Sequence, residues 1–108
     1  MSHRVFLTAD AERDLERIID HIAENDLPEK ALYVLARIQT VIDELADFPH
    51  RGNFPKELLS IGIRDYREVY FKPYRIIYRV IQTDVFVYLI ADGRRDMQAL
   101  LERRLLEQ

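Results

Sequence analysis

Arginine residues in the last third of the chain have a spacing that suits the binding of an anion. Arg75 and Arg79 lie four residues apart in residues 74–80, a run typical of a β-strand, and Arg94 and Arg95 follow the next apolar run. Side chains alternate across a strand, so Arg75 and Arg79 share one face, where a charged group must reach a solvated or functional surface. Guanidinium groups bind phosphates through paired N–H donors. These four arginines are therefore our candidate residues for binding a target.

The same face also allows a structural interpretation, in which Glu68 and Arg75 form an ion pair between neighbouring strands. A two-residue turn between the strands would place Glu68 and Tyr70 on the face of Arg75. A three-residue turn would place Arg67 and Val69 there instead, and the sequence does not choose between the two registers. Both interpretations stay open, and the residue types alone favour the structural one.

Few other side chains are arranged for catalysis or for binding a cofactor. His3, His21 and His50 are scattered, and none forms a pair at metal-ligand spacing. The chain has no cysteine, so neither a disulfide framework nor cysteine-ligated zinc is available. Glu57 follows a loop with turn-forming residues, 49–55, and could approach the arginine face, although a lone glutamate in such a place is more often a solvated loop residue. We expect no metal and no cofactor.

The residues before the arginine region predict a short strand and a pair of helices. Residues 5–7 are an apolar run that ends at Thr8, a residue type common at helix N-caps. Apolar side chains then recur at helical spacing over residues 9–25, and again from Pro28 to about residue 48. Because the link between the two segments is short, the helices should form an antiparallel hairpin. The charged face of the first helix, which includes Asp14, is expected to be solvated.

From residue 58 the pattern changes to the alternation that is typical of β-strands. Short turns should join the strands as an antiparallel meander, and we expect them at about 58–62, 65–71, 74–81 and 84–91. The last of these is apolar on both faces and should lie inside the sheet. Asp96 can cap a final helix whose packed stripe is Met97, Leu100, Leu101 and Leu105. The predicted fold class is α+β, with a short N-terminal strand, an antiparallel two-helix hairpin, an antiparallel sheet of about four strands and a short C-terminal helix.

Length and composition fit a small globular protein. With 108 residues, 48% hydrophobic and 32% charged, the chain is long enough to bury a core, and we treat residues 1–108 as a single domain. The net charge is −3, but residues 1–63 have an excess of five acidic side chains and residues 64–108 an excess of two basic ones. No apolar run approaches the roughly 20 residues that span a bilayer, and the N-terminus lacks the apolar core of a signal peptide. We expect a cytoplasmic protein without membrane contact.

The order of these segments resembles the RelE/ParE superfamily of type II toxins over nearly the whole chain. Each motif is short, but their order and spacing together are specific; the motifs are Leu7-Thr8, Ala11 to Leu15, Leu45 to Pro49 with Gly52, Tyr66-Arg67, Tyr74 to Tyr78 and Gly93-Arg94-Arg95-Asp96. The resemblance implies a RelE/ParE-like fold and a growth-inhibiting toxin of the plasmid-stabilisation type. It also implies a cognate antitoxin that wraps around the toxin and assembles with it into a hetero-oligomer.

The superfamily includes two mechanisms, and the fold alone does not choose between them. RelE-like members cleave messenger RNA on the ribosome, whereas ParE-like members poison DNA gyrase and have no nuclease chemistry. For a ribonuclease, the resemblance would assign catalysis to Arg67, Arg75, Arg95 and Glu57.

Two departures from the RelE-like pattern weaken the ribonuclease alternative. Leu101 stands where RelE-like enzymes place a tyrosine, and Asp92 stands where many relatives place a histidine, so the usual general-acid candidates are missing. An acidic chain is also poorly suited to approach a polyanion such as the ribosome. We therefore expect a toxin that poisons DNA gyrase and is not an enzyme. The ribosome-dependent endoribonuclease is the alternative, and a nontoxic binding module on the same fold is the third interpretation.

Overall fold

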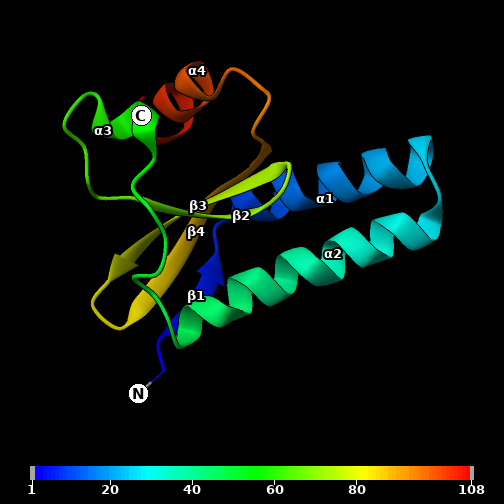
Figure 1. Ribbon diagram of the computed structural model, residues 1–108, viewed down its shortest axis with the longest axis horizontal. Coiled ribbons are helices and arrows are strands. Elements are labelled where there is room, and N and C mark those ends of the chain that lie inside the picture. The colour runs from blue at the N-terminus through cyan, green and yellow to red at the C-terminus, as the bar shows by residue number, and fades with distance from the viewer. Residues whose placement is uncertain (1, 108) are drawn as a thin grey trace.

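The computed structural model describes residues 2–107 of the chain (Figure 1). Within them, two long helices and four strands form most of the molecule, with short helical segments in one loop and at the C-terminal end. In chain order the elements are β1 (Arg4–Leu7), α1 (Ala9–Asn25), α2 (Pro28–Asp43), a 3-10 turn (Glu44–Ala46), α3 (Lys56–Leu59), β2 (Arg67–Phe71), β3 (Tyr74–Ile81), β4 (Asp84–Asp92), α4 (Met97–Leu101) and a final π-helical turn (Glu102–Leu106). The α+β class is confirmed.

The four strands form one mixed sheet in the order β1-β4-β3-β2. β2, β3 and β4 are antiparallel neighbours, as predicted, and β4 lies inside the sheet between β1 and β3. β1 pairs with β4 in parallel, with Val5 opposite Val85. The fourth strand of the sheet is thus the N-terminal strand, and the long connection that a parallel pair needs runs through the helices and the other two strands.

The strand predicted at residues 58–62 is wrong, because this segment begins inside the short helix α3. The carbonyl oxygen of Pro55 accepts hydrogen bonds from the amides of Leu58 and Leu59 at 3.1 and 2.9 Å. The Leu58 side chain is fully buried among the residues of the C-terminal helix. A single helical turn is too short to reveal the 3.6-residue period, so an apolar run of this length resembles a strand.

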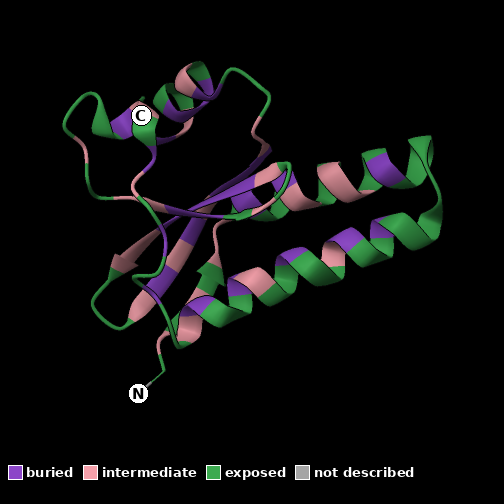
Figure 2. Ribbon diagram, viewed as in Figure 1, coloured by how far each residue is buried: buried purple, intermediate pink, exposed green. Residues whose placement is uncertain are grey.

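α1 and α2 form the predicted antiparallel hairpin, which covers one face of the sheet and projects beyond it (Figures 1 and 2). Thr8 caps α1, since its hydroxyl oxygen accepts a hydrogen bond from the Ala11 amide at 3.1 Å. Pro28 lies in the first turn of α2. The buried stripe of the hairpin packs on Ile76 and Tyr78 of β3, and its helical members are Ala11, Ile22, Ala31, Val34, Ile38 and Ile42.

The other face of the sheet is covered by α3, α4 and the final turn. Asp96 caps α4 by accepting a hydrogen bond from the Ala99 amide at 3.1 Å. The stripe predicted for the C-terminal helix is buried here against Ile77 and Leu89, and it consists of Met97, Leu100, Leu101 and Leu105. β3 is therefore buried on both faces. Among the described residues, no helix is long and apolar enough to cross a membrane.

Candidate functional site

The turn at Lys72-Pro73 has two residues, and it sets a register in which Tyr70 pairs with Arg75. Glu68 therefore lies on the face of Arg75, and the ion pair between the strands is confirmed. Arg75 Nε donates to Glu68 Oε1 at 2.7 Å, and Nη2 donates to Glu68 Oε2 at 3.1 Å. The alternative register, with Arg67 beside Arg75, is excluded.

Arg75 is also bound by Glu57, which α3 carries to the sheet, so the approach of Glu57 to the arginine face is confirmed and its interpretation as a solvated loop residue is wrong. The two Nη atoms of Arg75 donate to the two carboxylate oxygens of Glu57 at 2.8 and 2.7 Å. Arg75 is 8% exposed, and the side chains of Glu57 and Glu68 are 11% and 3% exposed. One guanidinium thus lies between two carboxylates in a buried cluster that joins α3, β2 and β3. We call this cluster the Arg75 clamp (Glu57, Glu68 and Arg75).

Each charge in the Arg75 clamp is stabilised by its partner. The hydrogen bonds from Arg75 lower the pKa of the Glu57 carboxyl, although burial opposes them. The same bonds raise the pKa of Arg75, so the guanidinium keeps its charge. A carboxylate whose pKa is lowered is a weak proton acceptor near neutral pH, and Glu57 is arranged here as an ion-pair partner of Arg75. Within residues 2–107, no group of acidic and histidine side chains is arranged to hold a metal ion.

Gly93 of the Gly-Arg-Arg-Asp motif packs on the aliphatic stem of Arg75. A Cβ atom at this position would lie 2.9 Å from Arg75 Cδ and 3.2 Å from the carbonyl oxygen of Pro73, which leaves no room for a side chain. The Gly93 amide donates to the same Pro73 oxygen at 2.8 Å. The two arginine motifs of the sequence are therefore coupled by direct contact, because the glycine lets β4 end against the β2–β3 turn.

Arg67 lies on the opposite face of the sheet, where it holds the loop that follows the helical hairpin. Its Nη1 donates to the carbonyl oxygens of Gly52 at 2.8 Å and His50 at 3.3 Å. The guanidinium also stacks on Phe54, 4.6 Å from the ring centroid. Because the sheet separates Arg67 from Arg75, the two side chains cannot bind one phosphate together.

Tyr78, which pairs with Arg67 across the strands, holds the same loop from the same face of the sheet. Its hydroxyl donates to the Pro49 carbonyl oxygen at 2.7 Å and accepts from the Gly52 amide at 3.1 Å. A Cβ atom on Gly52 would lie 2.5 Å from the Glu68 carbonyl oxygen and 2.7 Å from the Tyr78 hydroxyl, so the position requires glycine. Gly52 and Tyr78, which both belong to the sequence motifs, thus position the loop.

Arg79 projects from the sheet face opposite Tyr78, as strand alternation predicts. Its guanidinium lies 5.9 Å from the ring centroid of Tyr66, which packs with the cluster around the C-terminal helix. Arg79 also lies 3.5 Å from Asp65, and the side chains of the two residues are 39% and 55% exposed. This contact is long and solvated, so it leaves Arg79 partly available to a partner.

Arg94 and Arg95 lie at the surface after β4. Arg94 forms a two-point ion pair with Asp92, with Nη2 2.6 Å from Oδ2, and this pair lowers the pKa of the Asp92 carboxyl. Arg95 is exposed and joins no ion pair within residues 2–107. Leu101, at the position where RelE-like enzymes place a tyrosine, is fully buried in the apolar cluster of α4.

A buried ion pair that sequence analysis missed, Asp14 with Arg104, lies at an irregularity of the sheet. The register between β3 and β4 shifts at Tyr88, a bulge residue without a partner in β3. Arg104 Nη2 donates to the Tyr88 carbonyl oxygen at 3.2 Å, and the Ile90 amide donates to Asp14 Oδ2 at 3.0 Å. Two further bonds of 3.0 and 2.9 Å join Arg104 to Asp14. The pair therefore satisfies backbone groups that the bulge leaves free.

The expectation that Asp14 lies on a solvated face is wrong, since this residue is 9% exposed. The sequence contains a signal for its burial. Asp14 follows Ala11 by three residues and precedes Ile18 by four, so it shares the helical face of the apolar stripe. An acidic side chain in that position needs a partner, and here a distant arginine supplies one.

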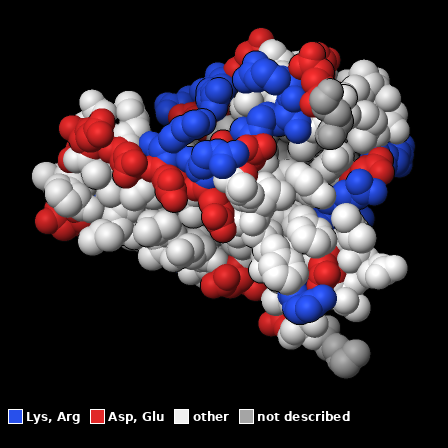
Figure 3. Space-filling model, turned by 180° about the vertical axis from the view of Figure 1, so that it is seen from behind, with Lys and Arg blue, Asp and Glu red and all other residues white. Residues whose placement is uncertain are grey.

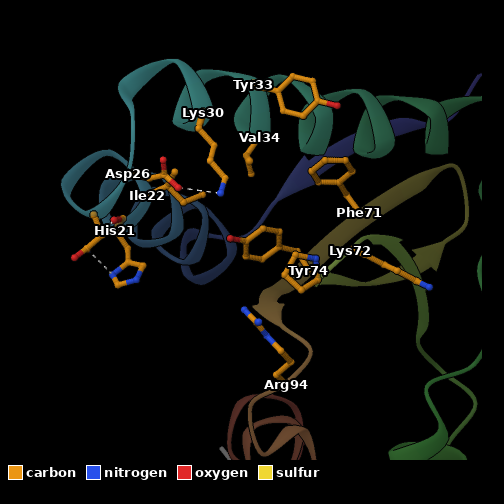
Figure 4. A pocket seen from close by; sticks show the side chains of 12 residues that line it. His21, Ile22, Asp26, Lys30, Tyr33, Val34, Phe71, Lys72, Tyr74 and Arg94 are labelled. Atoms are coloured by element: carbon orange, nitrogen blue, oxygen red, sulfur yellow. Dashed lines mark hydrogen bonds and ion pairs between the residues drawn. The ribbon is translucent and has the colours of Figure 1, made fainter.

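A pocket of about 480 Å³ opens between the tip of the helical hairpin, the β2–β3 turn and Arg94 (Figure 4). Tyr74 points into it from the sheet (Figure 4). Tyr33 and Phe71 contact each other edge to face on one side, with ring centroids 6.3 Å apart. Lys30 lies on the rim. The combination of aromatic rings and cationic groups suits apolar and acidic side chains of a protein partner.

Comparisons with known proteins agree with the resemblance seen in the sequence. The family described as "ParE toxin of type II toxin-antitoxin system, parDE" matches residues 5–97. Toxin ParE3 of Caulobacter vibrioides is 32% identical over 101 residues, which are 94% of this chain and 97% of that protein.

Solved structures share the fold at lower sequence identity. A chain of the chromosomal ParDE toxin–antitoxin system of P. aeruginosa has a TM-score of 0.69 at 22% identity, over 84% of this chain and 96% of that chain. A chain of the RelBE2 toxin–antitoxin complex of Mycobacterium tuberculosis has a TM-score of 0.61 at 21% identity, over 85% of this chain and 99% of that chain. A double arginine-to-alanine mutant of E. coli RelE in the free state has a TM-score of 0.64 at 17% identity, over 97% of this chain and 100% of that chain. These three similarities show the fold alone, whereas the family match and the ParE3 relative show that the chain belongs to the ParE toxins of type II toxin–antitoxin systems.

Proposed function

We propose that this toxin inhibits growth by poisoning DNA gyrase and that it is not a ribonuclease. The Arg75 clamp is the observation that carries the proposal. The strand arginine that a RelE-like enzyme would direct at the cleaved phosphate is bound here by Glu57 and Glu68. Two carboxylates beside one guanidinium repel a phosphate. Releasing Arg75 toward RNA would also leave both carboxylates unpaired in a buried site, at a high cost.

The other candidate groups for RNA cleavage also have different partners. Cleavage needs one group to accept the proton of the 2′-hydroxyl and another to protonate the leaving oxygen. Leu101 is buried and carries no hydroxyl, and Asp92 is held in its ionised form by Arg94. Arg67 faces the far side of the sheet. These placements support a toxin without nuclease chemistry.

Two assays on the purified toxin test the proposal. We expect the toxin to block supercoiling by gyrase or to trap cleaved DNA with the enzyme, while messenger RNA on ribosomes stays intact. Cleavage of ribosome-bound messenger RNA at codon positions, lost in Arg95→Gln but retained in Arg64→Gln, would refute it. Arg95 is the better probe of a nuclease because it is exposed, whereas lost activity in an Arg75 variant would follow from unfolding.

Growth measurements separate the third interpretation from the first two. Expression of the chain under tight control, without an antitoxin, should stop growth and induce the DNA-damage response if gyrase is the target. An early arrest of translation would instead favour the ribosome. Normal growth at a verified expression level would favour a nontoxic binding module. The gyrase proposal also places the chain in the cytoplasm, where gyrase acts.

We also propose that a cognate antitoxin neutralises this chain in a hetero-oligomer, and that part of it enters the pocket at the tip of the helical hairpin. Leu32 and Tyr33 of α2 are 67% and 59% exposed, so a partner can cover a large apolar area there. Lys30 and Arg94 also line the pocket, each paired with an aspartate but exposed, and can contact acidic side chains of the antitoxin. Co-expression with the product of the neighbouring reading frame should restore growth and give a complex that co-purifies. Tyr33→Asp should weaken that complex, and an unchanged complex would move the antitoxin to another surface.

A further inference from the structure

A band of arginines crosses the back of the molecule, where α1 lies beside the segment that follows β4. Figure 3 shows Lys and Arg side chains gathered there, next to a line of Asp and Glu side chains. Near the start of α1, Arg104 bonds to Asp14 at 2.9 Å and lies 3.9 Å from Asp10. Near the end of α1, Arg94 borders the same pocket as His21. The segment after β4 therefore reaches α1 through the side chain of Arg104, and Arg94 lies across the pocket from the last turns of α1.

α1 adds two more arginines to this surface. Asp10, Asp14, Arg17 and His21 are separated by steps of four, three and four residues, so they share one helical face. Arg17 thus lies between the positions that contact Arg104 and the position of His21, which lines the same pocket as Arg94. Arg13 lies one turn before Arg17 and forms an ion pair with Asp10. We define the arginine band as Arg13, Arg17, Arg94 and Arg95; Arg104, which is bound to Asp14, lies beside the band and is not part of it.

The arginine band keeps positive charge that its neighbours do not neutralise. Arg17 and Arg95 are exposed, and neither joins an ion pair within the part of the chain that the structure describes. The side chains of Arg13 and Arg94 are 54% and 79% exposed although each has an aspartate partner. The chain as a whole has a net charge of −3. Because positive charge is concentrated on this face of an otherwise acidic protein, the face should attract an anion.

The chemistry of the band fits nucleic-acid phosphates better than an acidic protein. Protein interfaces depend on apolar anchors that are buried at their centre. Among the large apolar side chains that are exposed, none lies within α1, and Leu106 alone belongs to the segment after β4. Phosphate contacts need only donors and charge. Arg13 and Arg17, about 6 Å apart along the helix axis, can contact different phosphates of one DNA strand, whose charges recur about every 3.4 Å along the axis of the duplex.

From this geometry, and resting on the proposed function, we infer that the arginine band binds the phosphate backbone of the DNA duplex that gyrase holds. The toxin would then contact enzyme and DNA together and stabilise the cleaved complex. The acidic remainder of the chain repels DNA, so binding to free duplex should be weak. The contribution of the band should therefore appear as a salt dependence of toxin action on the complex of gyrase with DNA.

The test compares two charge-matched double variants with the wild-type toxin. Arg17→Gln/Arg95→Gln removes the two band arginines that lack carboxylate partners. Arg37→Gln/Arg64→Gln removes two exposed arginines outside the band, and each variant changes the net charge by the same amount. The measurement is the toxin concentration that gives half-maximal DNA cleavage by gyrase at about 50 and 200 mM salt. Melting temperatures near that of the wild type confirm that both variants are folded.

Loss of two phosphate contacts should reduce the salt slope by about 1.8. The wild type and the Arg37/Arg64 variant should then lose roughly tenfold more potency over this salt range than the Arg17/Arg95 variant does. Equal salt dependence in all three proteins overturns the inference and leaves gyrase poisoning intact. A second outcome also overturns the inference. If the Arg17/Arg95 variant binds gyrase less tightly than the wild type does, and the loss is the same with and without DNA, then the band contacts the protein and not the DNA. A wild-type toxin without any effect on gyrase overturns the proposed function itself, and the inference with it.

Discussion

Replacement of Arg75 by alanine tests whether the Arg75 clamp is structural. The change removes four hydrogen bonds of 2.7–3.1 Å and leaves Glu57 and Glu68 facing each other in a buried site. Breaking a buried pair by removing one partner costs about 3–5 kcal/mol. At about 4 °C or more per kcal/mol, the melting temperature should fall by at least about 12 °C.

The pH dependence of this loss identifies its cause. In the wild-type protein Arg75 lowers the pKa of Glu57. The ionised Glu57 therefore stabilises the fold fully at pH values above the pKa of a glutamate in the unfolded chain, and this stabilisation is lost as the pH falls through the pKa of Glu57 in the folded protein. In Arg75→Ala the burial remains without the positive charge, so the pKa of Glu57 should rise. As the pH falls, protonation of Glu57 removes its unpaired charge, so the variant regains part of the stability that it lost. The difference in unfolding free energy between the two proteins should therefore be largest near pH 7.5 and smaller near pH 4.5.

Urea unfolding at the two pH values, followed by circular dichroism, provides the measurement. Arg95→Gln is the control for loss of one exposed arginine and should stay within about 0.5 kcal/mol of the wild type. The double variant Arg75→Ala/Glu57→Gln should be more stable than Arg75→Ala alone, because it has one buried carboxylate fewer. An Arg75→Ala protein within about 1 kcal/mol of the wild type at both pH values would refute the structural role. It would also return Arg75 to the list of residues that are free to act on RNA.

Three further substitutions test other parts of the fold. Asp14→Ala should cost about 2–4 kcal/mol, because it leaves the Ile90 amide without a partner and removes two of the three hydrogen bonds of Arg104, whereas the exposed Asp20→Ala on the same helix should cost under about 0.5 kcal/mol in urea unfolding. Tyr78→Phe should lower stability by about 1–3 kcal/mol and increase hydrogen exchange in residues 49–55, and unchanged exchange there would contradict the role of its hydroxyl. Ile38→Asp should largely unfold the protein in thermal melts, because Ile38 is fully buried, but Leu32→Asp on the same helix should not, because Leu32 is 67% exposed.

Elements specified by many residues could be predicted closely from the sequence. The bounds of α1 agree with the predicted range 9–25, because five apolar residues repeat the helical period and Thr8 caps the first turn. β3 agrees with the predicted 74–81 for a similar reason, since alternation and flanking turn residues indicate the same ends. The C-terminal stripe from Met97 to Leu105 also follows from helical spacing.

Features that depend on the exact length of one turn, or on contacts between distant parts of the chain, could not be predicted from the sequence. The register of β2 and β3 depends on the length of a single turn, and sequence alone left Arg67 and Glu68 as equal neighbours of Arg75. The parallel pairing of β1 with β4 joins residues about 80 positions apart and leaves no local pattern. The ion pair of Asp14 depends in the same way on a distant residue, Arg104, 90 residues later, although the helical spacing of Asp14 indicates its burial.

The positions of the motif residues explain why the family could be recognised from the sequence more easily than the mechanism. Gly52 and Tyr78 fix the loop, and Gly93 makes room for the stem of Arg75, so each is constrained by contacts inside the scaffold. Whether the strand arginine can act on a phosphate is decided elsewhere, by the carboxylates of Glu57 and Glu68. A chain with this scaffold but with neutral side chains at both positions would have a free guanidinium on the same sheet face. Residues 57 and 68 are therefore better indicators of nuclease chemistry on this fold than the arginine itself.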